Sequence, residues 1–279
     1  MHRFYRAAAR VRRFVPPAWG FRQWWYLWRP GFRYYRGSLP RSHLDRRAAI
    51  SRRRGYIYFR IPKAANTSVL AHLMCNELQL DELADPREKR RYAACYRSLS
   101  ELRVDEVQAF RQRFFLFTFV RNPYTRIASA YIHKIRGNRR PKKSVLRFYG
   151  QSAAEIKRPV SFAEFVTYLE GESPTRLDPH WAPQVALLPV PVTWLDFVGH
   201  QESFETDIHH VLQRIFGEGK QLRRIRQHYL ASGSSAQLEA LYTPELIERI
   251  ARLYHDDFMA FGYSTDFSRA QAPPSGAWR

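Results

Sequence analysis

The chain has 279 residues, a length that fits one α/β domain with short appendages. Hydrophobic residues make up 45% of it, so the chain can build a packed core and wholesale disorder is excluded. Its formal net charge of +21 attracts anionic partners, whether nucleotides, acidic sugars, nucleic acid or lipid, but does not choose among them.

Residues 1–54 form a basic, aromatic N-terminal arm in which Asp45 is the only acidic residue. Two interpretations of this arm are open. Arginine combined with tryptophan, as at Trp24, Trp25 and Trp28, suits a segment that contacts an anionic membrane surface peripherally. Alternatively, the arm packs over the following domain, with its aromatic rings covering the core and its arginines in solvent.

From residue 55 the pattern becomes that of an α/β domain. We expect strands at 55–61 and 114–120 and helices at 67–80 and 123–136. The run from Phe114 to Val120 is apolar throughout, which is typical of a strand buried on both faces of a parallel sheet. Asn122 followed by Pro123 predicts a capped helix start, and Gly137 predicts the end of that helix.

The second half continues this alternation after a basic connection at 138–159. We expect a helix to about 171 that opens with the Ser161–Glu164 capping box, a strand at 192–198, a helix at 202–216 and a last long helix that begins at Thr243-Pro244. Together these elements predict an α/β, P-loop-like three-layer sandwich, with a central parallel sheet flanked by helices, over residues 55–267. Residues 268–279 are predicted to be a disordered tail.

The two cysteines, Cys75 and Cys95, have no zinc-like spacing and make a poor disulfide framework. We interpret them as reduced residues in a reducing compartment. No run of about 18 apolar residues exists to form a transmembrane helix. We therefore expect a cytoplasmic protein, in peripheral contact with the inner face of the membrane if the arm binds lipid.

The first informative turn joins a strand to a helix. Its candidate nucleotide-binding residues are Arg60, Lys63, Ala64, Ala65, Asn66, Thr67 and Ser68. Free amides at a helix N-terminus, two hydroxyls and a lysine make a cradle for phosphate or sulfate. The turn lacks the glycines of a Walker A loop. An ordinary capped turn with a surface lysine remains the alternative.

The second turn follows the buried strand. Arg121 stands at the carboxyl end of that strand, where open α/β sheets bind their ligands. Ser129 follows two turns along the next helix, and an arginine and a hydroxyl together can hold a phosphate dianion. Arg126 is a further candidate. The alternative is a solvated arginine at 126 and a small packing residue at 129.

Taken together, the two turns resemble the nucleotide-binding motifs of the carbohydrate sulfotransferases, sulfotransferase family 2, whose members act on chondroitin, dermatan and the HNK-1 glycan. The likeness rests on Pro62-Lys63 and on Arg121, Pro123, Arg126, Ser129, Ala130 and Tyr131. It continues, in order, through His180-Trp181, Pro183-Gln184, Asp196 to Gly199, Glu202, Leu253-Tyr254, Asp257-Phe258 and Phe261 to Tyr263. It therefore covers roughly residues 55–264.

The resemblance implies the donor 3′-phosphoadenosine 5′-phosphosulfate and an acceptor hydroxyl on a carbohydrate or glycolipid. The first motif, with Lys63, would hold the 5′-phosphosulfate, and the second, with Arg121 and Ser129, the 3′-phosphate. The animal members also have a membrane anchor and cysteines after the His-Trp segment, where this chain reads Val185 to Pro189. These departures suggest a soluble, bacterial-type member.

Lys63 and His180 are the candidate catalytic residues. Lys63 would stabilise charge on the leaving oxygen, and His180 would take the proton of the acceptor hydroxyl. Asp178 and Glu77 are weaker candidates for the base. We expect no metal ion, because no acidic cluster lies near either turn and His209-His210 lacks a third ligand.

Two other function classes remain open at this stage. One is a nucleotide-dependent phosphoryl transferase, which would need magnesium ligands that the sequence does not display. The other is a non-enzymatic binder of nucleic acid or another anionic polymer, supported by the charge and the arm. We expect no nucleic-acid partner, because a binder of this kind would leave the ordered motifs as coincidence.

Overall fold

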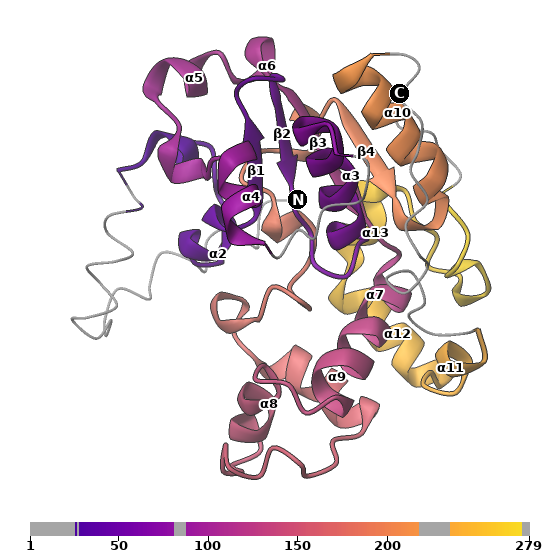
Figure 1. Cartoon of the computed structure of the whole chain (residues 1–279). Coiled ribbons are helices and arrows are strands. Elements are labelled where there is room, and N and C mark those ends of the chain that lie inside the picture. Colours follow the sequence, from indigo (N-terminus) through magenta and orange to yellow (C-terminus); the bar gives the residue numbers. More distant parts are fainter. Residues whose placement is uncertain (1–25, 27, 81–87, 218–234, 275–279) are drawn as a thin grey trace.

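A four-stranded sheet with helices on both faces forms the centre of the computed structural model (Figure 1). The structure describes residue 26 and residues 28–80, 88–217 and 235–274. The strands, in spatial order, are β1 (Ala48–Ser51), β2 (Tyr56–Phe59), β3 (Phe115–Val120) and β4 (Phe197–His200). β1 runs antiparallel to β2, while β2, β3 and β4 are parallel. The predicted α/β class with a central sheet flanked by helices is confirmed, and the sheet is mostly parallel, with the antiparallel strand β1 added at one side.

The strands divide their side chains between two cores because alternate residues of a strand point to opposite faces. On β2, Tyr56 and Tyr58 belong to one hydrophobic cluster, and Ile57 and Phe59 belong to the other. All four are buried, as expected for a parallel sheet covered on both sides.

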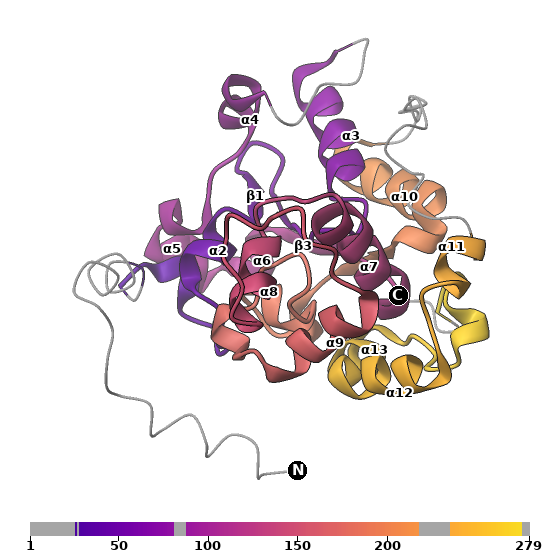
Figure 2. The same cartoon turned by 90° about the horizontal axis from the view of Figure 1, so that it is seen from below.

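The first face is covered by α3 (Asn66–Leu78) and α10 (Phe204–Phe216). The second cluster includes residues of α7 (Pro123–Ala130), α9 (Phe162–Gly171), α12 (Pro244–Leu253) and α13 (His255–Phe261). The other α-helices in the described part of the chain are α2 (Arg41–Asp45), α4 (Lys89–Cys95), α5 (Val104–Gln108), α6 (Phe110–Arg113), α8 (Lys142–Phe148) and α11 (Ser235–Glu239). In Figure 2, which views the molecule from below, α8 and α9 lie in front of the sheet, with α12 and α13 beside α9.

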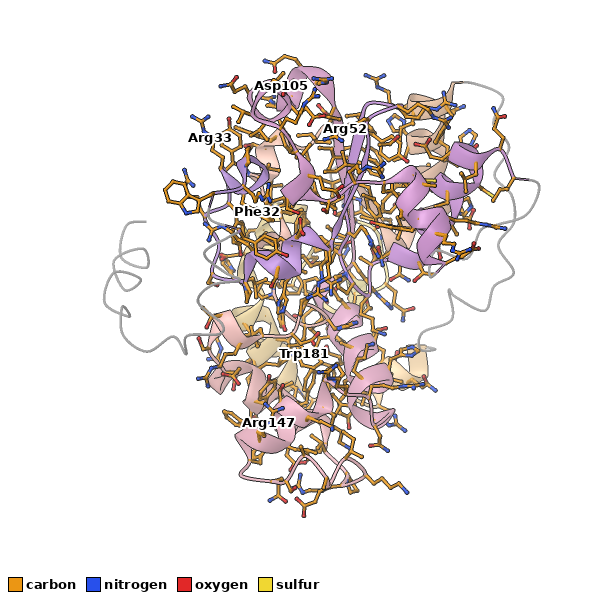
Figure 3. All side chains as sticks on the ribbon, turned by 60° about the vertical axis from the view of Figure 1, so that its left-hand side comes forward. Phe32, Arg33, Arg52, Asp105, Arg147 and Trp181 are labelled. Atoms are coloured by element: carbon orange, nitrogen blue, oxygen red, sulfur yellow. The ribbon has the colours of Figure 1, made fainter. Side chains whose placement is uncertain are left out.

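Most predicted elements are present with small shifts. The helix after Asn122 continues past α7 as a π-helical segment, Tyr131–Arg136, and stops at Gly137 as expected. The Ser161–Glu164 capping box is formed at the start of α9. Figure 3 labels Trp181, which is fully buried, and Arg147 of α8, which is exposed, both in the lower half of the view.

Three expectations about secondary structure were wrong. The strand predicted at 192–198 lies at Phe197–His200, because residues after Pro191 form a 3₁₀ turn instead. The last long helix breaks at Tyr254 into α12 and α13. The connection at 138–159 contains α8, whose Val145 and Leu146 are fully buried.

The packed domain begins before residue 55. β1 forms an edge of the sheet, and Phe32, Tyr35, Leu39 and Leu44 are buried in the second cluster (Figure 3 labels Phe32). The described part of the arm therefore packs on the domain, while residues 1–25 lie outside the described residues. At the other end, Ala270 is buried too, so packing extends into the predicted tail.

None of the helices that the structure describes is long and apolar enough to span a membrane. Cys75 is buried, Cys95 is partly exposed, and both are free thiols.

These contacts predict where the chain can be shortened. A chain that begins at Tyr26 should unfold cooperatively in urea with near full-length stability. A chain that begins at Gly55 lacks β1 and four buried side chains, each of which contributes roughly 1.5–3 kcal/mol. That sum approaches the whole stability of a typical domain, about 5–15 kcal/mol, so this chain should not fold. Cooperative unfolding of the shorter chain, followed by circular dichroism, would contradict the assignment.

Candidate active site

The donor turn predicted at 60–68 lies between β2 and α3. Lys63 and Ala65 both have positive φ angles, 70° and 52°, in the left-handed region that glycine usually occupies. Each such residue costs about 1–3 kcal/mol, a strain that concentrates at functional sites. The left-handed Ala65 is followed directly by the first helical residue, Asn66, and alternation of this kind turns successive amides toward one concavity that binds anions.

Lys63 is partly buried among other cations. Burial, together with the nearby charges of Lys134, Arg121 and Arg126, lowers the pKa of Lys63 to about 7. A large fraction of Lys63 is therefore uncharged at neutral pH, until an anion enters the site and favours the charged form.

Other residues of the turn support its shape. Arg60 donates from Nε to Asn66 Oδ1 at 3.0 Å and from a terminal nitrogen to the Tyr92 hydroxyl at 3.0 Å. Ala64 and Ser68 are buried, while Thr67 is partly exposed at the first turn of α3. The amides of a first helical turn have no partner within the helix and can bind an anion.

Arg121 follows β3 at the edge of the sheet where the donor turn lies. It is 8% exposed and donates from Nε to Thr125 Oγ1 at 2.9 Å and from a terminal nitrogen to the Lys63 carbonyl at 3.4 Å. Burial lowers the pKa of Arg121 to about 10, so it keeps its charge at neutral pH. Gln184 fixes its backbone, because the amide side chain pairs with both the N–H and the carbonyl of Arg121 at 3.0 and 2.8 Å.

Arg126 is fully buried and has a different environment. Its guanidinium donates to three backbone carbonyls: Pro62 at 3.1 Å, Pro179 at 3.1 Å and Ala182 at 2.8 Å. The first belongs to the donor turn and the other two flank His180. This geometry favours a structural role in which Arg126 joins the two segments; its predicted contact with the nucleotide stays a prediction. Ser129, one turn further along α7, is 3% exposed.

His180 and Asp178 form a hydrogen-bonded pair. Asp178 Oδ1 lies 2.5 Å from His180 Nδ1 and also accepts from the His180 N–H at 2.9 Å. A carboxylate at Nδ1 favours the tautomer with the proton on Nδ1 and a free lone pair on Nε2. Burial lowers the pKa of His180, and Lys134 and Arg47 lower it further against the opposing effect of Asp178. The neutral form of His180 is therefore favoured, and this form can accept a proton.

The segment that carries His180 is anchored by Tyr254, at the break between α12 and α13, and by Asp257 of α13. Tyr254 donates its hydroxyl proton to the Trp181 carbonyl at 2.5 Å, and the ring of Trp181 is fully buried. The Asp257 carboxylate accepts from the N–H groups of Gln184 and Val185 at 2.8 and 2.9 Å. The break at Tyr254 thus gives the segment two separate anchors.

Glu202 secures the second turn. Its two carboxylate oxygens accept from the Asn122 N–H at 2.9 Å and from the Tyr263 hydroxyl at 2.8 Å. Burial raises the pKa of Glu202, while Asn122, Tyr263 and the nearby charge of Arg121 oppose that rise. The carboxylate therefore ties the start of α7 to the segment after β4 and to Tyr263.

Glu77, a weaker candidate for the base, lies near the far end of α3 and pairs with Arg53 at 3.1 Å. Eleven residues of helix separate it from Asn66, roughly 16 Å at the rise of an α-helix. Among the described residues no group of three or more His, Cys, Asp or Glu could hold a metal ion, and metal independence stays a prediction.

The arrangement described so far is matched by known proteins. A model described as the sulfotransferase family matches residues 46–264, most of the chain and all the residues of this site. The chain belongs to the sulfotransferase family. The match begins before residue 55, in agreement with the packing of β1 on the domain.

The chain is similar to several animal carbohydrate sulfotransferases. It is 29% identical to human carbohydrate sulfotransferase 14 over 232 residues, which cover 80% of this chain and 61% of the relative. It is 26% identical to zebrafish (Danio rerio) carbohydrate sulfotransferase 11, with 75% of this chain and 64% of the relative covered. Mouse carbohydrate sulfotransferase 8 is 27% identical over 265 residues. The chain thus spans about three fifths of the length of these relatives, and no solved structure matches it significantly.

Sequence reasoning missed several residues near the site. Lys134 and Arg47 lower the pKa of His180, and the charge of Asp178 acts on His43. Arg47 and His43 fell within the arm, where nothing distinguishes one arginine from another. Gln184 lay within the resemblance, but its pairing with the backbone of Arg121 leaves no signal in a single sequence.

The role of Arg126 yields a stability prediction. Arg126→Met should lower the free energy of unfolding by about 3–5 kcal/mol, because the nearby buried Asp257 loses its compensating charge and three carbonyls lose their donor. The measurement is urea denaturation. Arg136→Met is the matched control, since Arg136 is exposed at the end of the same helical segment and should change stability by under about 0.5 kcal/mol. Equal stability of the two variants would refute the buried role.

Proposed function

We propose that the protein is a sulfotransferase that moves a sulfuryl group from 3′-phosphoadenosine 5′-phosphosulfate to a hydroxyl of a carbohydrate or glycolipid. One observation carries the proposal: Arg126 joins the strained anion-binding turn to the segment with the His180–Asp178 pair. A donor cradle and a neutral base thereby lie at one edge of the sheet. The names of the relatives support the carbohydrate acceptor.

The donor side of the reaction uses fixed positive charge. The amides of the turn and the Thr67 and Ser68 hydroxyls hold the 5′-phosphosulfate, and Arg121 with Ser129 holds the 3′-phosphate. Lys63 stabilises the negative charge that develops on the bridging oxygen as the bond from sulfur to the 5′-phosphate breaks. Because the transfer is loose and in line, positioning and charge supply most of the acceleration.

The acceptor side needs a base. The hydroxyl oxygen forms the new bond to sulfur while its proton moves to Nε2 of His180, and adenosine 3′,5′-bisphosphate leaves. Asp178 holds the imidazole in the required tautomer and stabilises the imidazolium that forms.

The direct test is calorimetric binding of adenosine 3′,5′-bisphosphate with a chelator present, together with an acceptor screen using donor labelled in its sulfate. Tight binding without metal supports the proposal, and binding that needs magnesium favours a phosphoryl transferase. Preference for the bisphosphate over adenosine 5′-monophosphate should shrink in Arg121→Ala and Ser129→Ala, since a charge-assisted hydrogen bond contributes roughly 1.5–3 kcal/mol. Unchanged discrimination in both variants would place the 3′-phosphate elsewhere.

The lowered pKa of Lys63 predicts a pH dependence of donor binding. The free site has a pKa of about 7 at Lys63, and a bound anion raises it. Binding above pH 7 must therefore take up a proton, and the affinity for adenosine 3′,5′-bisphosphate should fall by up to about tenfold per pH unit. Calorimetry in buffers of different ionisation enthalpy measures the uptake directly.

Two variants provide the controls. Lys63→Arg keeps its charge throughout this range, so its affinity should not change between pH 7 and 9. Lys63→Met should bind weakly and also independently of pH, and it should lose most of its turnover. Proton uptake that persists in Lys63→Met would assign the titration to another group, such as His133 or His180.

Location and membrane contact are part of the proposal. Cytoplasmic residence with peripheral attachment through residues 1–25 is supported by their arginines and tryptophans. The full chain should co-sediment with anionic vesicles in a salt-sensitive manner, and the chain that begins at Tyr26 should not. Equal sedimentation of both chains would assign the contact to the folded domain.

A further inference from the structure

The order of the strands gives the site two sides, one next to β3 and one next to β1. Arg121 follows β3, Lys63 follows β2, and Arg47 immediately precedes β1, whose first residue pairs with the last of β2. All three therefore lie at the end of the sheet where the parallel strands β2 and β3 finish and the antiparallel strand β1 begins. A nucleotide that extends from Lys63 to Arg121 occupies the β3 side, which leaves the β1 side of Lys63 for the acceptor.

Hydrogen bonds connect Arg47 to the rest of the site. Its carbonyl accepts from the Arg60 N–H at 2.6 Å, where the donor turn begins. Two residues further on, Pro62 accepts from Arg126, which also bonds the Pro179 carbonyl beside His180. The acceptor side thus has Arg47 at one border and the His180–Asp178 pair at another.

The polar side chains on this side can bind an anion: Arg47 and Lys134 supply charge, and His43, whose pKa burial lowers, supplies a ring N–H. Arg47 Nε and His43 Nδ1 are buried, and neither meets a hydrogen-bond partner in the described part of the chain. Asp178 is the acid that influences both side chains, and its Oδ1 already accepts from His180. A guanidinium nitrogen that is withdrawn from water without an acceptor destabilises the protein. An anionic ligand that accepts a hydrogen bond from Arg47 would remove this penalty.

Lys134 is the third polar residue of this group, and it comes from the π-helical segment that follows α7. It follows Arg126 by two helical turns, and the π-helical segment widens the second turn so that both residues stay on the face toward the donor turn. Its charge acts on Lys63, Asp178 and His180.

We propose that Arg47, with His43 and Lys134, forms a subsite for an anionic group, carboxylate or sulfate ester, carried by the acceptor beside the hydroxyl that is sulfated. The inference rests on the proposed function, because it places the acceptor next to His180. Arg47 supplies the specific contact, a guanidinium that can bond two oxygens of one anion. Neutral acceptors would leave this group desolvated and unpaired.

The test is thermal unfolding of the full chain saturated with adenosine 3′,5′-bisphosphate, with sodium sulfate or sodium glucuronate as probes. Sodium chloride at matched ionic strength and glucose are the blanks. Both anions should raise the unfolding midpoint in a saturable manner, and glucose should not. Arg47→Gln should raise the apparent Kd of both anions about tenfold or more. Arg46→Gln is the matched control, since it removes the same charge from an exposed neighbour and should behave as wild type.

Lys63→Met shows whether an anion that stabilises the protein binds at the donor's position or beside Arg47. A sulfate response lost in Lys63→Met but kept in Arg47→Gln would place sulfate at the donor's own position and overturn the subsite. An equal response in Arg46→Gln and Arg47→Gln, or no response in the wild type, would overturn it too. Failure of the bisphosphate itself to bind would instead count against the proposed function, and the anion response of the nucleotide-free protein would still report on Arg47.

Discussion

The guanidinium of Arg126 is fully buried, and three backbone carbonyls from two distant segments depend on it. Its planar, fixed donors can bond carbonyls in different directions, which a lysine ammonium cannot do in the same geometry. Because α7 follows β3 directly, this one side chain sets the distance from the sheet edge to both the donor turn and the His180 segment. Asp257 compensates its charge and bonds the same segment, so the pair acts as one support.

The second constraint is electrostatic. Lys63, Arg121, Lys134 and Arg47 are gathered at one edge of the sheet, and their mutual repulsion opposes folding. The strained residues of the donor turn add to that cost. Two hydrophobic cores, one on each face of the sheet, supply the offsetting free energy. The cations are therefore held in place before the ligand arrives. A bound anion reduces their mutual repulsion, and this gain contributes to its binding free energy.

The sequence predicted the fold where local signals were strong. The apolar run of β3 and the Asn122-Pro123 cap mark a strand and a helix by their own chemistry. β1 was missed because Ala48–Ser51 is short and becomes a strand only by pairing with β2. In the site, Lys63 and Arg121 were identifiable because they follow strands. The roles of Arg126, Gln184 and Arg47 depend on contacts between residues far apart in the chain, and no periodicity or motif encodes which arginine is buried.

The two sides of the site also affect one another through His180. Of the two cations that lower its pKa, Lys134 also acts on Lys63 of the donor turn, whereas Arg47 lies on the acceptor side. The donor therefore restores the charge of Lys63 while leaving the effect of Arg47 on His180 in place. An anionic group at Arg47 would reduce that effect and raise the basicity of His180. On this arrangement the base becomes a better proton acceptor when the acceptor is bound, so proton removal is coupled to the presence of the hydroxyl that reacts.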